Sequence, residues 1–255
     1  MKKLLTFRTI IFDTQRFAAG KTIPANEVFE YFRETHDSDD DDVTKQDEEK
    51  IIKWLLGSRS KDLLLEELGV GADAFIDYSV KQPVIENPQD KPGDIDILIC
   101  PYRRPDIAIA FQCKPVIVKS LNELEDDDVK KLCRISDLVE QANRQRNKYG
   151  FYRNYLAILI KVDGRKKLKY NPLFRGTNPE TFQTIYEFPD RENVHKDVGI
   201  VFIEIVQPTG KSFDEYVAVR VCIETEATRL NQSPNLTNRV EELMKRKGVT
   251  ASRRT

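Results

Sequence analysis

Residues 155–162 read Tyr-Leu-Ala-Ile-Leu-Ile-Lys-Val, an almost unbroken apolar run with a single charged side chain. Successive side chains of a β-strand point to opposite faces, so a strand of this composition is apolar on both faces. It is stable only inside a sheet whose two faces are covered by other elements. We therefore expect a central sheet with helices packed against it.

Further segments rich in β-branched and aromatic residues, or alternating in polarity, predict six more strands. They lie at 3–13, 74–80, 94–100, 107–118, 198–206 and 216–225. Apolar residues three and four positions apart predict helices, and a proline at the start of a segment adds one more. These helices are expected at about 24–33, 48–56, 61–68, 121–148 and 235–247.

From residue 61 the elements follow the order α-β-β-β-α-β, with the three consecutive strands expected to form an antiparallel meander. This order predicts an α/β (α+β) class, with a central mixed sheet flanked by helices. We expect a single domain over 1–255. Its parts are an N-terminal elaboration (1–58), a catalytic core (59–165) and C-terminal strands with a helix (166–255).

Composition excludes several classes of protein. No apolar run approaches the roughly 18 residues that a membrane span needs, and charged residues interrupt the N-terminus too soon for a signal peptide. The four cysteines show no C-x-x-C spacing, and the two histidines have no partner pattern. We therefore expect a cytoplasmic protein without a disulfide framework or a histidine-based catalytic centre.

The formal net charge of −1 conceals an uneven distribution. Residues 37–49 hold eight acidic residues and one lysine, without the periodicity of a packed element or the spacing of a calcium loop. This segment is expected to be a loop, with an acidic interaction patch as the alternative. Residues 161–169 are basic and suit a polyanionic partner, although a solvated hairpin has the same composition.

Two segments combine polar and apolar residues in the pattern of a chemical site. Residues 93–99 read Gly-Asp-Ile-Asp-Ile-Leu-Ile, and residues 109–114 read Ile-Ala-Phe-Gln-Cys-Lys. Strand alternation predicts that Asp94 and Asp96 share one face, with Ile95, Ile97 and Ile99 on the other. In the same way Gln112 and Lys114 should share a face. If the two strands are neighbours, these four polar side chains converge.

Such a set of groups suits phosphodiester hydrolysis. Carboxylate and amide oxygens bind Mg²⁺, which neutralises charge on the phosphate and lowers the pKa of bound water. A nearby lysine can orient the water or stabilise the pentacovalent oxyanion. The alternative is an edge strand with one hydrated face, but the two motifs lie on consecutive predicted strands, ahead of a long helix.

The motif Gly-Asp-Ile-Asp, followed sixteen residues after Asp96 by Gln-Cys-Lys, resembles the core of the PD-(D/E)xK nuclease superfamily. The glutamine form is similar to Mrr-like type IV restriction nucleases, and the first motif is also similar to Holliday-junction-resolvase-like members. The resemblance covers about residues 59–165. It implies a restriction-endonuclease-like core and a Mg²⁺-dependent nuclease, with Mn²⁺ as an alternative metal.

The resemblance implies a role for each matching residue. Asp96 is the metal-binding aspartate, Gln112 takes the place of the second acid, Lys114 is the catalytic lysine and Asp94 is an accessory metal ligand. The upstream acid of the family falls on Glu67, with Glu66 as the alternative. The chain departs from the family pattern at two positions. Gln112 is neutral, and Pro115, which cannot donate a ladder hydrogen bond, directly follows the lysine.

The predicted helix over 121–148 carries a polar stripe opposite its apolar one, which can neutralise backbone phosphates. The stripe contains Lys130, Arg134, Gln141, Arg144 and Lys148. An amphipathic helix with a hydrated basic face is the ordinary alternative.

We therefore expect an endonuclease acting on DNA in restriction or phage defence, with RNA as an open alternative. Double-strand cleavage would favour a homodimer. The first rival is an inactive member of the same fold that binds nucleic acid or a protein. The second rival is an interaction module that uses the acidic run 37–49.

Overall fold

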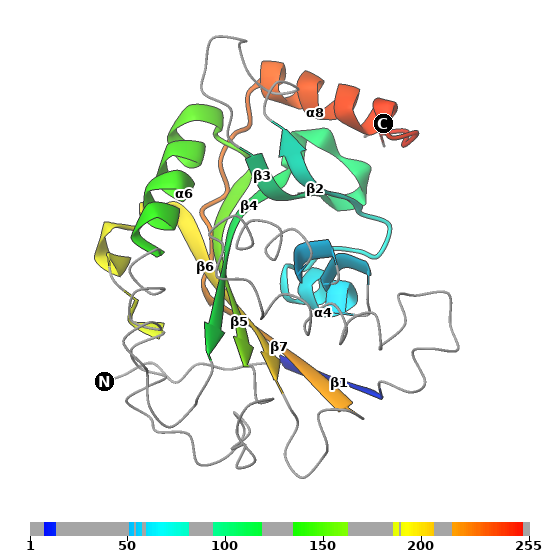
Figure 1. Ribbon diagram of the computed structural model, residues 1–255. Coiled ribbons are helices and arrows are strands. Elements are labelled where there is room, and N and C mark those ends of the chain that lie inside the picture. Colours follow the sequence, from blue (N-terminus) through cyan, green and yellow to red (C-terminus); the bar gives the residue numbers. More distant parts are fainter. Residues whose placement is uncertain are drawn as a thin grey trace, which may run out of the picture.

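The computed structural model describes residues 8–13, 51–53, 55–57, 60–81, 94–118, 135–162, 186–188, 190–206 and 216–251 (Figure 1). Within these ranges seven strands form one sheet in the order β1-β7-β6-β5-β4-β3-β2. The helix expected at 24–33 and the acidic run 37–49 lie outside the described residues.

The strands match the segments expected from alternation and β-branched composition. They are β1 (Arg8–Asp13), β2 (Phe75–Lys81), β3 (Asp94–Cys100), β4 (Ile109–Val118), β5 (Arg153–Val162), β6 (Val198–Val206) and β7 (Tyr216–Thr225). The bounds predicted for β3, β6 and β7 are confirmed to the residue. The apolar strand β5 lies in the middle of the sheet, and its residues 154–160 are all buried.

The sheet is mixed. Strands β4, β5 and β6 run parallel to one another, whereas the β1–β7, β7–β6, β4–β3 and β3–β2 pairs are antiparallel. The parallel pair β4–β5 requires a crossover, and helix α6 (Ile135–Tyr149) lies within it. The predicted mixed sheet with helices, of α+β class, is thus confirmed.

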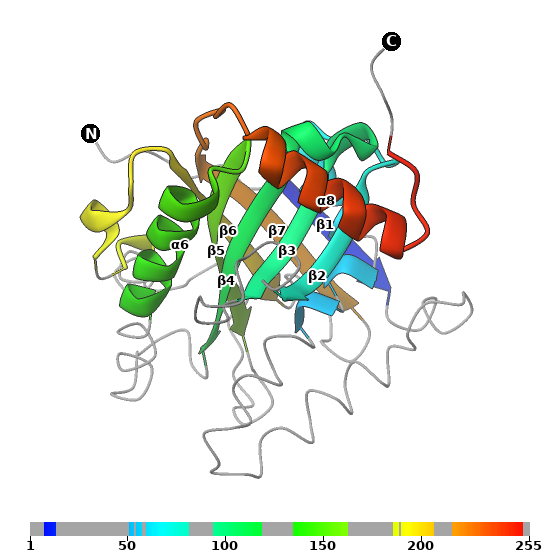
Figure 2. The same ribbon diagram turned by 90° about the horizontal axis from the view of Figure 1, so that it is seen from above.

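Helices cover both faces of the sheet, as the apolar composition of β5 predicts. Helix α4 (Ser60–Glu67) and the helical residues 51–57, of which Trp54 is not described, pack on the face that includes Phe111 of β4 and Val201 of β6. Helix α6 packs on the other face over β4, β5 and β6. Helix α8 (Pro234–Arg246) packs on that same face over β2, β3 and β4, beside α6 (Figure 2).

Local capping signals determine where two of these helices begin and end. Gly69 has a φ of 65° just after α4, and Val70 donates its backbone N–H to the carbonyl of Leu65 at 2.8 Å, which closes the helix. At α8 the Ser233 hydroxyl accepts a hydrogen bond from the Leu236 N–H at 3.2 Å. Among the helices in the described ranges, none is long and apolar enough to cross a membrane.

Candidate functional site

Strands β3 and β4 stop pairing through their backbones at the position of the predicted site. Their paired residues run from Ile99 opposite Ile109 to Ile97 opposite Phe111. The next contact uses a side chain, because the backbone N–H of Cys113 donates to Asp96 Oδ2 at 2.6 Å. The carboxylate of Asp96 thus lies against the backbone that joins Gln112 to Lys114.

The face alternation predicted for β3 is wrong at Ile95. Ile97 and Ile99 pack on the α4 face, but Ile95 packs with Leu98 in the cluster under α8. The change of face coincides with an unusual backbone conformation in the neighbouring strand, where Ser79 has a φ of 48°. The β2–β3 pairing skips the Ser79 position, running from Tyr78 opposite Ile97 to Val80 opposite Ile95. Asp96 therefore lies at an irregularity that the sequence pattern did not indicate.

Strand β4 keeps a regular alternation, because its register with β5 is unbroken from Ile109 to Val118. Phe111 and Cys113 belong to the α4-side cluster. The even-numbered residues face the other way, so that Ala110 packs under α8 and Val116 packs under α6. Gln112 and Lys114 lie between these two apolar clusters, as the alternation predicts. Gln112 is only 5% exposed, and Lys114 is partly buried.

Pro115 produces no bulge against β5, where it pairs in register with Leu159. The Cys113 N–H points toward β3, and N–H groups of alternate strand residues point the same way. The donor that Pro115 lacks would therefore have pointed toward β3, whose pairing with β4 has already ended at Phe111. Among the described residues no strand pairs with β4 on that side at Pro115, so the missing N–H breaks no ladder hydrogen bond there.

The structure does not bring the predicted upstream acid to the other site residues. Glu67 Oε1 lies 2.8 Å from Arg8 Nε, and Glu66 Oε2 lies 3.6 Å from Arg8 Nη1. Arg8 belongs to β1, which β7, β6 and β5 separate from β4. Helix α4 also covers the face opposite Gln112. Asp94 begins β3 opposite Lys81, and its side chain is outside the described residues.

The described residues offer few further metal ligands near Asp96. Across the ranges that the structure describes, no group of three or more His, Cys, Asp or Glu residues could hold a metal ion. Asp96 on β3 and Gln112 on the neighbouring strand β4 carry one carboxylate and one amide oxygen, and Asp94 is two residues from Asp96 in the chain.

The predicted basic stripe is partly described. Gln141, Arg144 and Lys148 are exposed on α6, whereas Lys130 and Arg134 lie outside the described residues. The helix covers the face of the sheet that carries Gln112 and Lys114. The stripe and the predicted chemical groups therefore belong to the same side of the sheet.

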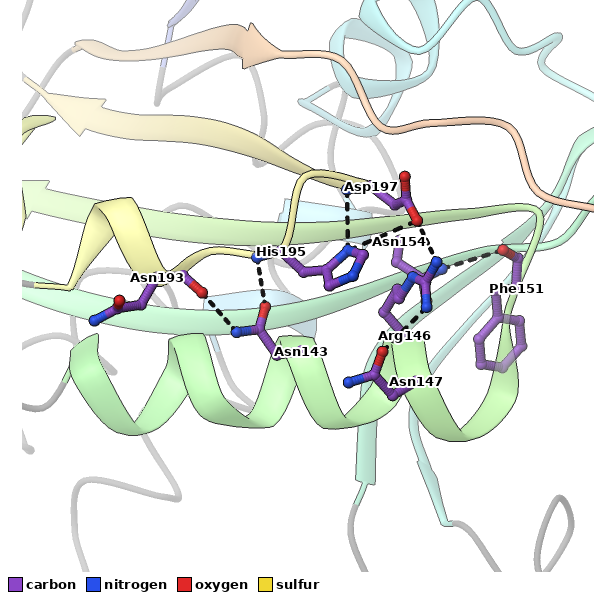
Figure 3. A network of polar contacts seen from close by, with 8 residues as sticks. All are labelled: Asn143, Arg146, Asn147, Phe151, Asn154, Asn193, His195 and Asp197. Atoms are coloured by element: carbon purple, nitrogen blue, oxygen red, sulfur yellow. Dashed lines mark hydrogen bonds and ion pairs between the residues drawn. The ribbon is translucent and has the colours of Figure 1, made fainter.

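Sequence reasoning missed a polar network that joins α6 to the segment before β6 (Figure 3). Arg146 forms an ion pair with Asp197, and its hydrogen bond holds the pKa of that carboxyl below the usual range. His195 Nδ1 accepts the Asp197 N–H at 3.2 Å, and Asn143 Oδ1 accepts the His195 N–H at 2.8 Å. No local pattern signals the contacts of Arg146 with Asp197 and of Asn143 with His195, because about fifty residues separate the partners.

A second polar cluster lies between β6 and β7. Glu204 is fully buried and sits opposite Arg220 in the strand register, with Arg220 Nη1 3.0 Å from Glu204 Oε2. The Tyr186 hydroxyl donates to the other carboxylate oxygen. Burial raises the pKa of Glu204, and Arg220 opposes that shift.

Comparison of the chain with models of known families, with curated proteins and with solved structures finds no match.

Proposed function

We propose that this protein is a Mg²⁺-dependent nuclease of the PD-(D/E)xK kind that hydrolyses DNA phosphodiester bonds, in restriction or phage defence. The observation that carries the proposal is the hydrogen bond between Asp96 and the Cys113 N–H, which holds a carboxylate beside Gln112 and Lys114. A metal-dependent nuclease needs a hard oxygen ligand and a cation at one place.

The order of elements supports the same proposal. Helix α4, strands β2, β3 and β4, helix α6 and strand β5 follow one another, with an antiparallel meander and then a parallel strand. We take this α-β-β-β-α-β succession as support for the restriction-endonuclease-like core that the motif resemblance implies.

The residues at this position fit a magnesium ion. Mg²⁺ is usually held by one or two carboxylates together with waters and substrate phosphate oxygens. Asp96 and Gln112 would hold the ion, with Asp94 assisting. When bound, it supplies neutralisation of phosphate charge and a lower pKa for a coordinated water.

Residues of the chain itself make four contributions. The Cys113 N–H fixes the orientation of the Asp96 carboxylate, and burial of Gln112 limits the positions that its amide can adopt. The Lys114 ammonium orients the attacking water and stabilises the charge that develops on the phosphate oxygens. On α6, Arg144 and Lys148 bind backbone phosphates of the DNA.

One observation favours a second candidate, an inactive fold of the same kind that binds nucleic acid. Both acids considered for the upstream position, Glu66 and Glu67, pair with Arg8 instead. With Gln112 in place of an acid, the metal would be held by less negative charge than in sites with two or three carboxylates.

The deciding experiment is nicking of supercoiled plasmid by the purified protein in Mg²⁺, in Mn²⁺ and in EDTA. We expect cleavage with either metal and none in EDTA. Lys114→Ala should be inert, while Lys53→Ala, an exposed lysine on the α4 side, should cleave like the wild type. An inert wild type that still binds DNA would establish the second candidate.

A further inference from the structure

Ser79 holds a backbone conformation that is rare inside a strand. It lies in β2, which forms one edge of the sheet (Figure 2), and its φ is 48°. This is the left-handed region, which glycine adopts readily and which costs free energy for a residue with a side chain. Residues held in such conformations cluster at functional sites, where the surrounding structure requires the local geometry. The position that Ser79 faces is therefore informative.

Ser79 lies directly opposite Asp96, and these two residues do not pair. Tyr78 pairs with Ile97 on one side of them, and the pairing resumes in the same register at the next residue of each strand. The register therefore aligns Ser79 with Asp96 without an inserted residue in either strand. One member of this unpaired position is the aspartate of the proposed metal site.

Both strands change face at the unpaired position. On β2, Tyr78 packs against the α4-side cluster, but Val80 packs under α8. On β3, Ile97 packs on the α4 side, but Ile95 packs under α8. Residues two apart share a face in a regular strand. The two strands therefore rotate together at this point.

The rotation accounts for the direction of the Asp96 side chain. Side chains of a regular strand stand roughly perpendicular to the sheet, whereas the backbone N–H groups that join strands lie within it. The Asp96 carboxylate accepts the Cys113 N–H of β4 at 2.6 Å, so it is directed sideways, along the sheet. A regular conformation at this position would direct the carboxylate to one face instead.

Contacts on both sides of Ser79 hold β2 in its rotated path. Before it, Asp77 Oδ1 lies 3.2 Å from Lys247 Nζ at the end of α8. After it, Val80 packs in one cluster with Met244 of α8. Local strand irregularities are frequent at sheet edges and beside active sites, where they redirect a side chain.

We infer that Ser79 is a positioning residue for the proposed metal site. Its left-handed backbone lets β2 follow the rotation of β3, and this rotation directs the Asp96 carboxylate toward the Cys113 N–H. The role belongs to the backbone conformation of Ser79 and not to its hydroxyl. The inference rests on the proposed function for the metal, but the direction of the carboxylate can be measured without it.

Two substitutions separate the conformation from the hydroxyl. Ser79→Gly removes the hydroxyl and keeps the left-handed conformation without steric cost. Ser79→Thr keeps the hydroxyl, but its branched Cβ disfavours that conformation. Tyr102→Thr is the matched control, because the exposed Tyr102 has a φ of 52° in the 3₁₀ turn Pro101–Arg103, which follows the other end of β3.

The first measurement is hydrogen exchange of the Cys113 amide by NMR, in the metal-free full chain. A hydrogen bond to a charged group changes an opening equilibrium roughly 10- to 150-fold. We expect Ser79→Thr to accelerate exchange of this amide by that factor, and Ser79→Gly and Tyr102→Thr to leave it near the wild-type rate. The amide of Ile158, in the central strand β5, reports on global unfolding in the same samples.

The second measurement is the Mg²⁺ concentration for half-maximal plasmid nicking. Loss of a group that orients a metal ligand typically weakens metal binding roughly 10- to 100-fold. Ser79→Thr should raise the Mg²⁺ requirement by that factor, while Ser79→Gly and Tyr102→Thr should match the wild type. If the hydroxyl acted instead, the glycine and threonine variants would exchange places.

Several results would overturn the inference. Unchanged Cys113 exchange in Ser79→Thr would do so, as would an equal acceleration at Ile158, which would show only a loss of global stability. Accelerated Cys113 exchange in Ser79→Gly would also overturn it, and this variant decides the question even if Ser79→Thr does not fold. A wild type that does not nick DNA would refute the proposed function, while the exchange rates would still test Ser79.

Discussion

Asp96 on β3 and Cys113 on β4 are joined by a hydrogen bond of 2.6 Å between the Asp96 carboxylate and the Cys113 backbone N–H. Asp96 is one residue beyond Ile97 and Cys113 is two residues beyond Phe111, the last residues that pair through their backbones. The carboxylate thus takes the place of a ladder acceptor, and one side chain has both a structural and a proposed chemical role.

These two roles of Asp96 can be separated by substitution. Asp96→Asn keeps an oxygen acceptor for Cys113, whereas Asp96→Ala leaves that N–H unpaired. We expect the alanine variant to lower the free energy of unfolding by about 1–3 kcal/mol, and the asparagine variant by less. Both should lose plasmid nicking, because neither supplies a carboxylate for the metal. Urea unfolding and nicking assays on the same preparations check this, and a fully active Asp96→Asn would refute the metal role.

Lys114→Ala should reduce cleavage without an equal effect on DNA binding. Removal of one group that stabilises transition-state charge typically lowers the rate roughly 100- to 1,000-fold. The exposed Lys53→Ala variant is the matched control for loss of one positive charge. Nicking rates and duplex affinity in Ca²⁺ provide the two readouts. Equal cleavage by Lys114→Ala and wild type would remove the lysine from the mechanism.

Gln112→Glu tests whether the glutamine stands at a metal ligand position. A carboxylate binds a hard cation more strongly than an amide oxygen does, so the Mg²⁺ concentration for half-maximal nicking should fall. Gln141→Glu, an exposed change on α6, is the control for added negative charge. A Mg²⁺ requirement that does not change in Gln112→Glu would argue against ligation at this position.

Asp197 should contribute to stability near neutral pH and lose that contribution in acid. Its pKa is lowered in the folded protein, chiefly by the hydrogen bond from Arg146, so the folded state binds fewer protons than the unfolded state in acid. This contribution is complete above the ordinary aspartate pKa of about 3.9 and is lost as pH falls through the lower folded value. Asp197→Asn should lower the Tm at pH 7, and the difference from wild type should shrink toward pH 2.

The exposed Glu192→Gln variant is the control for that pH profile. A Tm difference between Asp197→Asn and wild type that stays constant from pH 7 to pH 2 would show that the ion pair does not stabilise the fold.

The buried pair of Glu204 and Arg220 should behave as one unit. Glu204→Gln leaves the Arg220 charge without its partner, which typically costs about 3–5 kcal/mol. The double variant Glu204→Gln with Arg220→Met removes both charges and should regain much of that loss. Chemical denaturation of the wild type, both single variants and the double variant measures the coupling. Additive effects would mean that the two side chains do not interact.

The sequence by itself determined the elements and the alternation along β4. Periodicity and capping residues reveal where elements begin and end, because these limits depend on side chains close in the chain. Examples are the bounds of β3, β6 and β7 and the ends of α4 and α8. Gln112 and Lys114 share a face for the same reason, because β4 is regular against β5.

Tertiary structure alone decided which groups meet across the sheet. Ile95 leaves the face of Ile97 at the point where Ser79, on the neighbouring strand, adopts a left-handed backbone. Glu67 forms an ion pair with Arg8, and the His195 N–H donates to Asn143, because the fold brings together segments about fifty or more positions apart. Such pairings depend on the packing of the whole chain, and local spacing along the sequence does not encode them.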